Sequence, residues 1–248
     1  NMFLTAERLN VLPRLLSPLH PKVHRKGYYR SMRVIARLDI KGANVVKTVR
    51  AEGLRVVGNP VALAERYYAE KADELVYMDI VASLYGRNLD FEQLKAVSQN
   101  VFIPITVGGG IRSLNDIGMA LQAGADKVAI NTYAIRDSEF LREAAQKFGS
   151  QCIVLSVEAK KTGEGKWEAY TDGGREKTGI DVLEWITRAI ELGVGEVLLT
   201  SVDADGTRNG FDIELIRAVA RISTVPVIAN GGADSVADIL AAVQAGTD

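Results

Sequence analysis

Short runs of apolar, largely β-branched residues alternate along this chain with longer stretches whose apolar positions recur at helical spacing. From Arg33 onward the pattern predicts strands at residues 33–39, 74–80, 102–107, 127–131, 151–157, 196–202 and 225–229. Helical patterns lie between them, and several end at a glycine, as helix C-terminal capping favours. Continuous apolar strands separated by helices are typical of a parallel sheet covered by helices.

An internal repeat extends this prediction to the whole architecture. Adding 122 to the residue number carries Pro104 onto Pro226 and the pair Gly109 and Gly110 onto Gly231 and Gly232. A shift of 119 lays the first predicted strand on the fifth. Two copies of a four-strand unit predict an α/β fold, a (β/α)8 TIM barrel built from two half-barrel repeats.

The repeat also predicts what belongs at the end of the barrel. In the first copy Asp126 is followed by the strand at 127–131, and Asp126 corresponds to Asp248 in the second copy. We therefore expect a barrel that lacks its final strand and helix, so that residues 32–248 form a TIM-barrel domain truncated before strand eight. Such a fragment would expose two edges of a parallel sheet.

Residues 1–31 differ from the rest of the chain. Three of the six prolines and both histidines lie there, without the apolar run of a secretory signal. We expect an extension or translated leader, disordered and outside the barrel, with the natural start at Met32. A targeting peptide is the rival interpretation, which Glu7 and the prolines disfavour.

Composition narrows the possible partners. The 248 residues carry a net charge of -1, without a long cationic block, so nucleic acid and an anionic membrane surface are not expected. The single Cys152 cannot form an intrachain disulfide, and no apolar run approaches the length of a membrane span. The sequence predicts a cytoplasmic protein without a metal site or cofactor.

Two carboxylates stand at corresponding strand ends. Asp39 ends the first predicted strand and Glu158 follows the fifth. In TIM barrels the catalytic groups lie at the carboxyl ends of the strands, so the pair predicts acid/base chemistry across a bound substrate. The alternative is that each carboxylate only pairs with a nearby cation, Lys41 or Lys160.

Glycines and hydroxyl groups follow the other strand ends. Gly109, Gly110, Asn131 and Thr132 offer N–H and hydroxyl groups for a phosphate, and the sequences SVDADGT and NGGADS occupy the corresponding ends in the second half. Two matching sites predict a substrate with a phosphate at each end. The alternative is that the glycines serve only the backbone of turns.

Taken in order, RLDIKGANVVK, ADELVYMDIVAS, IPITVGGGIRS, GADKVAINT, GEVLLTSVDADGT and PVIANGGA resemble the HisF family across residues 32–248. That family is the cyclase subunit of imidazole glycerol phosphate synthase in histidine biosynthesis. The resemblance implies ammonia from a HisH-like glutaminase subunit and a bis-phosphorylated substrate (PRFAR), converted to imidazole glycerol phosphate and AICAR.

The resemblance also implies residue roles. Asp39 would be the first catalytic acid/base, and Lys47 would belong to a mobile loop over the substrate. Gly110, Asn131 and Thr132 would bind one phosphate, and Asp205, Gly206, Gly231 and Gly232 would surround the other. Arg33, Glu74, Lys127 and Glu196, at the starts of four strands, match the charged ring that gates ammonia in this family; the alternative is ordinary capping of a solvated barrel end.

Three departures keep further functions open. Glu158 stands in SVEAK where AIDAK is usual, Arg37 replaces a small residue or Cys, and Val81 stands where Thr is common. Arg37 shares a strand face with Asp39 and would keep that carboxylate ionised. These changes resemble paralogues that conduct ammonia to a sugar amidotransferase in surface-polysaccharide biosynthesis. A truncated chain without activity is the third possibility.

Overall fold

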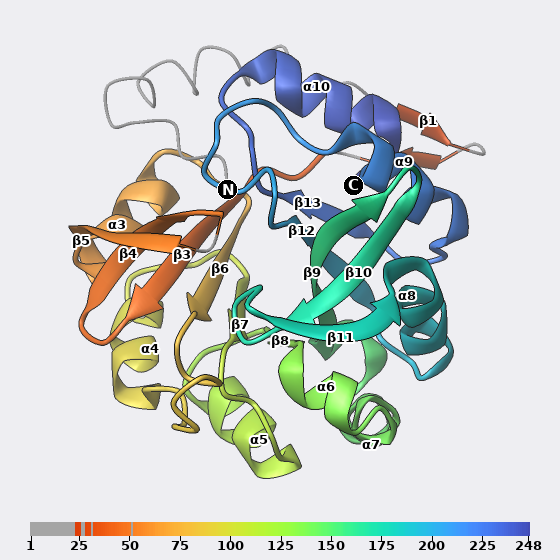
Figure 1. The fold of residues 1–248 in the computed structure, drawn as a ribbon. Coiled ribbons are helices and arrows are strands. Elements are labelled where there is room, and N and C mark those ends of the chain that lie inside the picture. Colours follow the sequence, from red (N-terminus) through yellow and green to blue (C-terminus); the bar gives the residue numbers. More distant parts are fainter. Residues whose placement is uncertain (1–22, 26–27, 31, 51) are drawn as a thin grey trace.

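The computed structural model describes residues 23–25, 28–30, 32–50 and 52–248. Most of them form an α/β fold in which helices cover the outside of a curled β-sheet (Figure 1). Seven strands make the parallel part of the sheet, and all seven predicted strands are present. They are β3 (Ile35–Lys41), β6 (Glu74–Asp79), β7 (Ile105–Gly108), β8 (Lys127–Ile130), β9 (Ile153–Gly163), β12 (Glu196–Ser201) and β13 (Val227–Asn230). They neighbour one another in chain order, which is the arrangement of a TIM-barrel-like fold.

Helices connect these strands and cover the outside of the curl. In the described residues they are α3 (Pro60–Ala69), α4 (Phe91–Ser98), α5 (Leu114–Gln122), α6 (Thr132–Arg136), α7 (Glu139–Phe148), the short 3₁₀ turn Ser150–Cys152, α8 (Val182–Glu191), α9 (Ile213–Ile222) and α10 (Val236–Ala245). Many begin behind a side chain that accepts free backbone N–H groups. In α10, for example, Ser235 and Asp238 form a reciprocal capping box.

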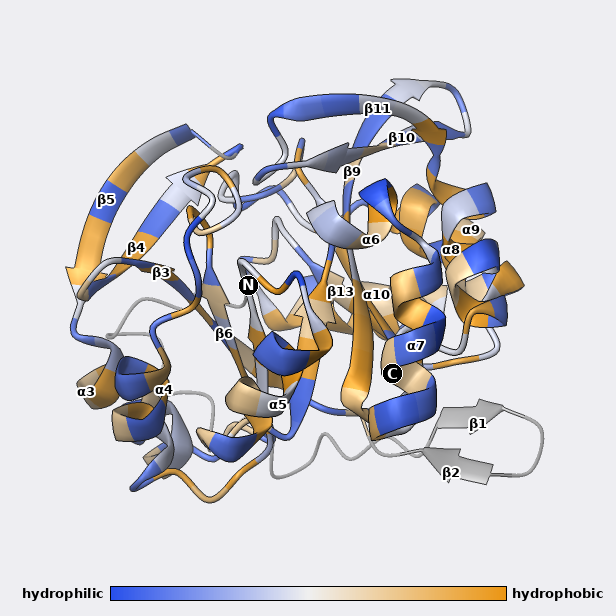
Figure 2. Ribbon diagram, turned by 90° about the horizontal axis from the view of Figure 1, so that it is seen from below, coloured by the Kyte–Doolittle hydropathy of each residue, from blue (hydrophilic) through white to orange (hydrophobic). Residues whose placement is uncertain are grey.

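The strands are buried on both faces. On β6, Leu75 and Tyr77 belong to the main core, which lies between the sheet and the helices. Val76 and Met78 alternate with them and belong to a smaller apolar cluster inside the curl, with Val154 and other residues. This two-sided burial explains why the strands read as continuous apolar runs rather than as alternating ones. Figure 2 shows the hydrophobic colouring concentrated on the central strands and on the helix faces next to them.

Four antiparallel strands that extend the main sheet were not predicted. β4 (Asn44–Val49) and β5 (Glu52–Gly58) follow β3, and β10 (Lys166–Thr171) and β11 (Glu176–Asp181) follow β9. Each set extends the sheet from the carboxyl end of its parallel strand. Most residues of β5 and β11 are exposed, and the few apolar ones, such as Leu54 and Val56, are interrupted by polar residues or glycine, so the continuous apolar runs that identified the parallel strands are missing there.

The parallel path begins at β3 and ends at β13. Among the described strands β13 pairs only with β12. A cavity of about 70 Å³ lies between the two end strands, and its lining includes the apolar Ile35 and Ile228 and the charged Arg33 and Asp248. In the N-terminal extension the structure describes an antiparallel pair, β1 (Val23–Arg25) and β2 (Tyr28–Arg30), which the sequence pattern did not predict. No helix in the described ranges has both the length and the apolar character needed to cross a bilayer.

Candidate active site

The two predicted carboxylates lie in one cavity at the carboxyl ends of the strands. Asp39 is on β3 and only 4% exposed, and Glu158 is on β9. Both line a cavity of about 40 Å³ together with Asp205, which follows β12. The sheet's curl therefore brings together side chains that are more than a hundred residues apart in the chain.

Arg37 holds Asp39. Two residues apart on β3, their side chains point to the same face, and Arg37 Nε donates to Asp39 Oδ1 at 2.7 Å. Arg37 Nη1 also donates to Thr200 Oγ1 on β12, at 3.3 Å. Burial by itself lowers the pKa of Arg37, but the charges of Asp39 and Asp205 outweigh it and leave that pKa above its ordinary value. The cation hydrogen-bonded to Asp39 is thus a permanently charged guanidinium on the same strand.

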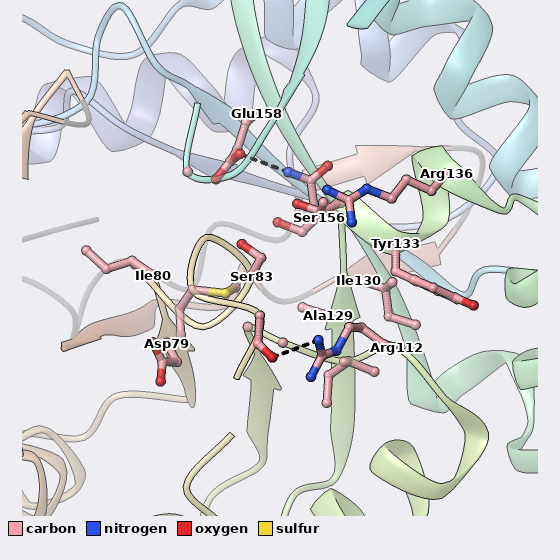
Figure 3. A pocket seen from close by; sticks show the side chains of 18 residues that line it. Asp79, Ile80, Ser83, Arg112, Ala129, Ile130, Tyr133, Arg136, Ser156 and Glu158 are labelled. Atoms are coloured by element: carbon pink, nitrogen blue, oxygen red, sulfur yellow. Dashed lines mark hydrogen bonds between the residues drawn. The ribbon is translucent and has the colours of Figure 1, made fainter. Parts of the chain in front are cut away.

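Glu158 has a different environment. Its Oε2 accepts from Asn131 Nδ2 at 2.8 Å, the dashed line at Glu158 in Figure 3. The same oxygen accepts from the backbone N–H of Gly174, also at 2.8 Å. Burial raises the pKa of Glu158 to about 7, against the opposing effects of the Arg37 charge and the Gly174 hydrogen bond. Lys160, the neighbouring cation considered from sequence, lies over the ring of Tyr170 instead. Glu158 is therefore a carboxyl group able to carry a proton near neutral pH.

A larger cavity of about 110 Å³ opens beside Glu158 (Figure 3). Gly109, Gly110, Asn131 and Thr132 line it, as do three polar residues that sequence reasoning missed, Ser83, Arg112 and Arg136. Gly109 has a φ of +101°, and a Cβ there would lie 2.1 Å from the carbonyl oxygen of Asp79. Only glycine allows this close approach of the two backbones.

We call the carboxyl-terminal end of the curled sheet its mouth. The residues predicted for the second phosphate follow β12 and β13 at this end. A Cβ on Gly231 would lie 2.7 Å from the Ser201 carbonyl oxygen, and one on Gly232 would lie 2.0 Å from that of Gly210. A Cβ on Gly206 would lie 2.4 Å from the Thr48 carbonyl oxygen in the β4 strand. Asp205 accepts from Thr48 Oγ1 at 3.3 Å. These turns are therefore packed closely against the β4–β5 extension.

Lys47 on β4 faces the same cluster. Burial lowers its pKa, while the charges of Asp205 and Asp39 act in the opposite direction. The Oδ1 atom of Asp205 is buried without a hydrogen-bond partner among the described residues. The mouth of the curl thus combines three carboxylates with the cations Arg37 and Lys47. No group of three or more His, Cys, Asp or Glu side chains in the described segments is arranged to hold a metal ion.

At the opposite end of the sheet, the four predicted ring residues form a closed ionic ring. Arg33 donates to Glu74 Oε1 and Glu196 Oε1, each at 2.6 Å. Lys127 Nζ donates to Glu74 Oε2 and Glu196 Oε2, each at 2.9 Å. Both glutamates are buried, and all four of their oxygens are used. Glu74 starts β6 two residues before Val76 of the inner apolar cluster, so the ring lies at the amino-terminal end of that cluster.

Comparison with known proteins agrees with this geometry. Residues 33–248 match the model of a family described as "Histidine biosynthesis protein". The curated relatives include "Imidazole glycerol phosphate synthase subunit HisF" of Legionella pneumophila, 58% identical over 202 residues, which cover 82% of this chain and 95% of the relative. The chain belongs to the HisF family. Proteins of the same name from Mycobacteroides abscessus (52% identical, 87% of this chain, 86% of the relative) and Thermobifida fusca (51%, 88% and 87%) are further relatives.

In this HisF-family chain several residues around the site were not found from sequence. Thr48 and Arg175 line the small cavity, and Gly174 donates to Glu158 from the turn between β10 and β11. They lie on the antiparallel extensions, which the apolar pattern did not reveal. The one available signal was the glycine-rich sequence TDGGRE at residues 171–176, which is typical of a tight turn.

Proposed function

We propose that this chain is the cyclase subunit of imidazole glycerol phosphate synthase, which takes ammonia from a partner glutaminase and converts PRFAR to imidazole glycerol phosphate and AICAR. The observation that carries the proposal is the cavity shared by Asp39 and Glu158 in a chain of the HisF family. Adding ammonia to a carbonyl requires one group that removes a proton and one that delivers a proton. Asp39, which is hydrogen-bonded to the Arg37 guanidinium, and Glu158, whose pKa is about 7, provide these two groups.

The bis-phosphorylated substrate would span the mouth of the curl. One phosphate is assigned to the 110 Å³ cavity, where Gly109, Gly110 and Thr132 would contact it and Arg112 and Arg136 would supply positive charge. Asn131 was also predicted there. Its amide now donates to Glu158 and to the Tyr170 carbonyl oxygen, so binding a phosphate requires it to change partners.

The second phosphate is assigned to the opposite side of the mouth. Asp205, Gly206, Gly231 and Gly232 would surround it through their backbone N–H groups, and Lys47 would supply charge. The close packing of Gly206 against Thr48 supports this assignment, because it joins the proposed phosphate turns to the strand that carries Lys47. The reactive part of the substrate would then lie between the two sites, next to Asp39 and Glu158.

Ammonia would enter from the opposite end, through the ring of Arg33, Glu74, Lys127 and Glu196. The apolar cluster above the ring, which includes Val76, Ala129 and Leu198, separates it from the carboxylates. A neutral ammonia molecule crosses apolar surroundings far more readily than ammonium does, because desolvating an ion is expensive. In this proposal the glutaminase subunit docks at the ring end.

The half-barrel origin belongs to the same proposal. β3 and β9, the strands predicted to correspond in the two halves, are each followed by an antiparallel extension, and each carries one of the two carboxylates. An eighth parallel strand between β13 and β3 would complete the barrel at the cavity that lies between these two strands.

One observation favours a second candidate function, that of an ammonia-conducting partner of a sugar amidotransferase in surface-polysaccharide biosynthesis. The ion pair of Arg37 and Asp39 occupies the mouth where the substrate would react. If Asp39 serves only to hold Arg37, the ring and the apolar interior would still conduct ammonia.

Turnover of PRFAR separates the two functions. With the glutaminase subunit and glutamine, or with ammonium salts alone, the cyclase proposal predicts formation of imidazole glycerol phosphate and AICAR. Absence of both products, with glutaminase activity intact, would contradict it and favour ammonia delivery.

Phosphate binding is tested by Gly109→Ala, with Gly165→Ala as the matched control. Both glycines have positive φ, but a Cβ at Gly165 meets nothing within 4 Å. We expect the control to lose about 1 kcal/mol of stability and to keep PRFAR affinity, and Gly109→Ala to weaken PRFAR binding on the order of tenfold or more. Equal affinities in a calorimetric titration would place the phosphate elsewhere.

A further inference from the structure

Arg37 is the feature of the mouth that the proposed reaction does not yet use. Its side chain is 11% exposed, although it carries a permanent charge in the interior of the curl. It reaches from β3 across to Thr200 on β12, whose hydroxyl also accepts from Asn230 on β13 at 3.0 Å. Hydrogen bonds to β3 and β12 therefore hold the guanidinium, and among its partners in the described residues only Asp39 is an anion.

The two carboxylates receive opposite kinds of donors. Asp39 Oδ1 receives a charge-assisted hydrogen bond, and a guanidinium has donors only, so the carboxylate at this oxygen must act as an acceptor. Glu158 receives two neutral donors, and both reach Oε2. Within the part of the chain that the structure describes, Oε1 accepts no such bond and remains available to hold a proton.

We propose that Arg37 is a positioning residue that divides the work of the two carboxylates, keeping Asp39 as the proton acceptor and leaving Glu158 as the proton donor. This inference rests on the proposed cyclase function. It goes beyond that function by assigning each carboxylate one direction of proton transfer and by giving a role to a residue that departs from the pattern of the family.

The assignment gives a balanced first step. When ammonia adds to the ribulosyl carbonyl, a C–N bond forms and the π pair of the C=O bond moves onto oxygen. That oxygen takes the proton of the Glu158 carboxyl group, and the nitrogen loses one proton to the Asp39 carboxylate. The products are a neutral carbinolamine, an ionised Glu158 and a protonated Asp39, so protons and charge are conserved.

Other charges around the cavity act on the same pair. They are Lys47 from β4, Asp172 and Arg175 from the turn between β10 and β11, Asp205 from the loop after β12, and Arg208 farther along that loop. Asp172 and Asp39 both raise the pKa of Glu158, whereas Arg37 lowers it. Removing the Arg37 charge should therefore raise the pKa of Glu158, because that carboxyl group loses a nearby cation.

The pH dependence of kcat/KM for PRFAR with ammonia tests the inference. The wild-type profile should fall as Glu158 loses its proton near pH 7. In Arg37→Gln this falling limb should move to higher pH by about one pH unit, because Glu158 loses a nearby cation, with a rate loss on the order of tenfold at pH 7. Arg37→Lys keeps the charge and should hold the falling limb near its wild-type position. A slower Arg37→Gln whose falling limb coincides with that of the wild type would show that Arg37 is merely structural.

A second measurement tests, without turnover, the protonation of Glu158 on which the inference depends. Infrared titration of the ligand-free protein should show one carboxyl group that ionises near pH 7, absent in Glu158→Gln and present in Asp39→Asn. The reverse assignment, or no such group in the wild type, overturns the inference. Absence of PRFAR turnover with this titration intact contradicts only the proposed function.

Discussion

The two ends of the curled sheet hold similar numbers of charged residues, but these residues are fully ion-paired at one end and only partly paired at the other. At the amino-terminal end, two cations and two glutamates form four ion pairs, and every glutamate oxygen has a cationic partner. At the carboxyl end, Asp39, Glu158 and Asp205 share one cavity, Glu158 has a pKa of about 7, and one buried oxygen of Asp205 lacks a hydrogen bond among the described residues. The ring is electrostatically satisfied, whereas the mouth is not.

The difference separates charges that are held in fixed ion pairs from charges that can exchange protons. A satisfied ring gains little from changing protonation, because each carboxylate is stabilised as an anion by two cations. A carboxyl group among other carboxylates in a buried site changes protonation easily, which is the property that acid/base catalysis requires. Breaking each end should therefore have a different consequence.

The largest effect on turnover is expected from replacing the carboxyl groups of Asp39 and Glu158. Asp39→Asn and Glu158→Gln preserve size and hydrogen bonding but cannot take up or release the proton. Each should lower ammonia-dependent kcat by about a hundredfold to ten-thousandfold. Steady-state assays of both variants, with circular dichroism to verify folding, measure this. A folded Glu158→Gln with nearly wild-type kcat would remove Glu158 from the chemistry.

Substitutions in the ring should instead lower the free energy of unfolding. Glu74→Gln leaves Arg33 and Lys127 sharing one glutamate, and since these cations are partly exposed we expect a loss of about 2 kcal/mol in the free energy of unfolding. Adding Lys127→Met restores neutrality, so the double variant should be less destabilised than the sum of the single variants. Denaturant unfolding measures both.

The matched control for the ring is Glu139→Gln, which breaks the exposed pair of Glu139 and Arg142. That substitution should change stability by only about 0.3 kcal/mol. If Glu74→Gln were equally harmless, the ring would not be the tightly coupled unit that its hydrogen bonds indicate.

A further expected effect is the pH dependence of stability that Glu158 causes. Its folded-state pKa of about 7 lies above the usual 4.5, so its contribution to stability is fully present below pH 4.5 and is lost as pH rises through 7. Glu158→Gln cannot ionise, so relative to the wild type it should gain about 3 kcal/mol between pH 4.5 and pH 8. Unfolding at both pH values, with the exposed Glu164→Gln as control, measures it. A difference that does not vary with pH would contradict the raised pKa.

The sequence predicted best those features that follow from strand position. The ring residues could be grouped because Glu74, Lys127 and Glu196 begin parallel strands and Arg33 precedes another, and parallel strands place their starts at one end. The same logic placed Asp39 and Glu158 together at the other end. Neither inference needed any knowledge of how the loops fold.

What the sequence could not predict depends on contacts between distant loops. The donors to Glu158 come from Asn131, after β8, and Gly174, in a turn between two antiparallel strands that carry little apolar pattern. Arg37 was expected to influence Asp39, but its hydrogen bond to Thr200 depends on the curl bringing β12 opposite β3. Hydrogen-bond partners of this kind are set by tertiary packing, which local sequence does not encode.

The most direct test of the different roles proposed for the two ends compares two sources of nitrogen. Turnover of PRFAR is measured with glutamine through the bound glutaminase, and separately with ammonium salts, for the wild type, Lys127→Met and Glu158→Gln. Our account predicts that Lys127→Met loses about tenfold or more with glutamine but stays within about threefold of the wild type with ammonium, whereas Glu158→Gln loses both. Equal losses with both nitrogen sources in Lys127→Met, or retained ammonium turnover in Glu158→Gln, would contradict it.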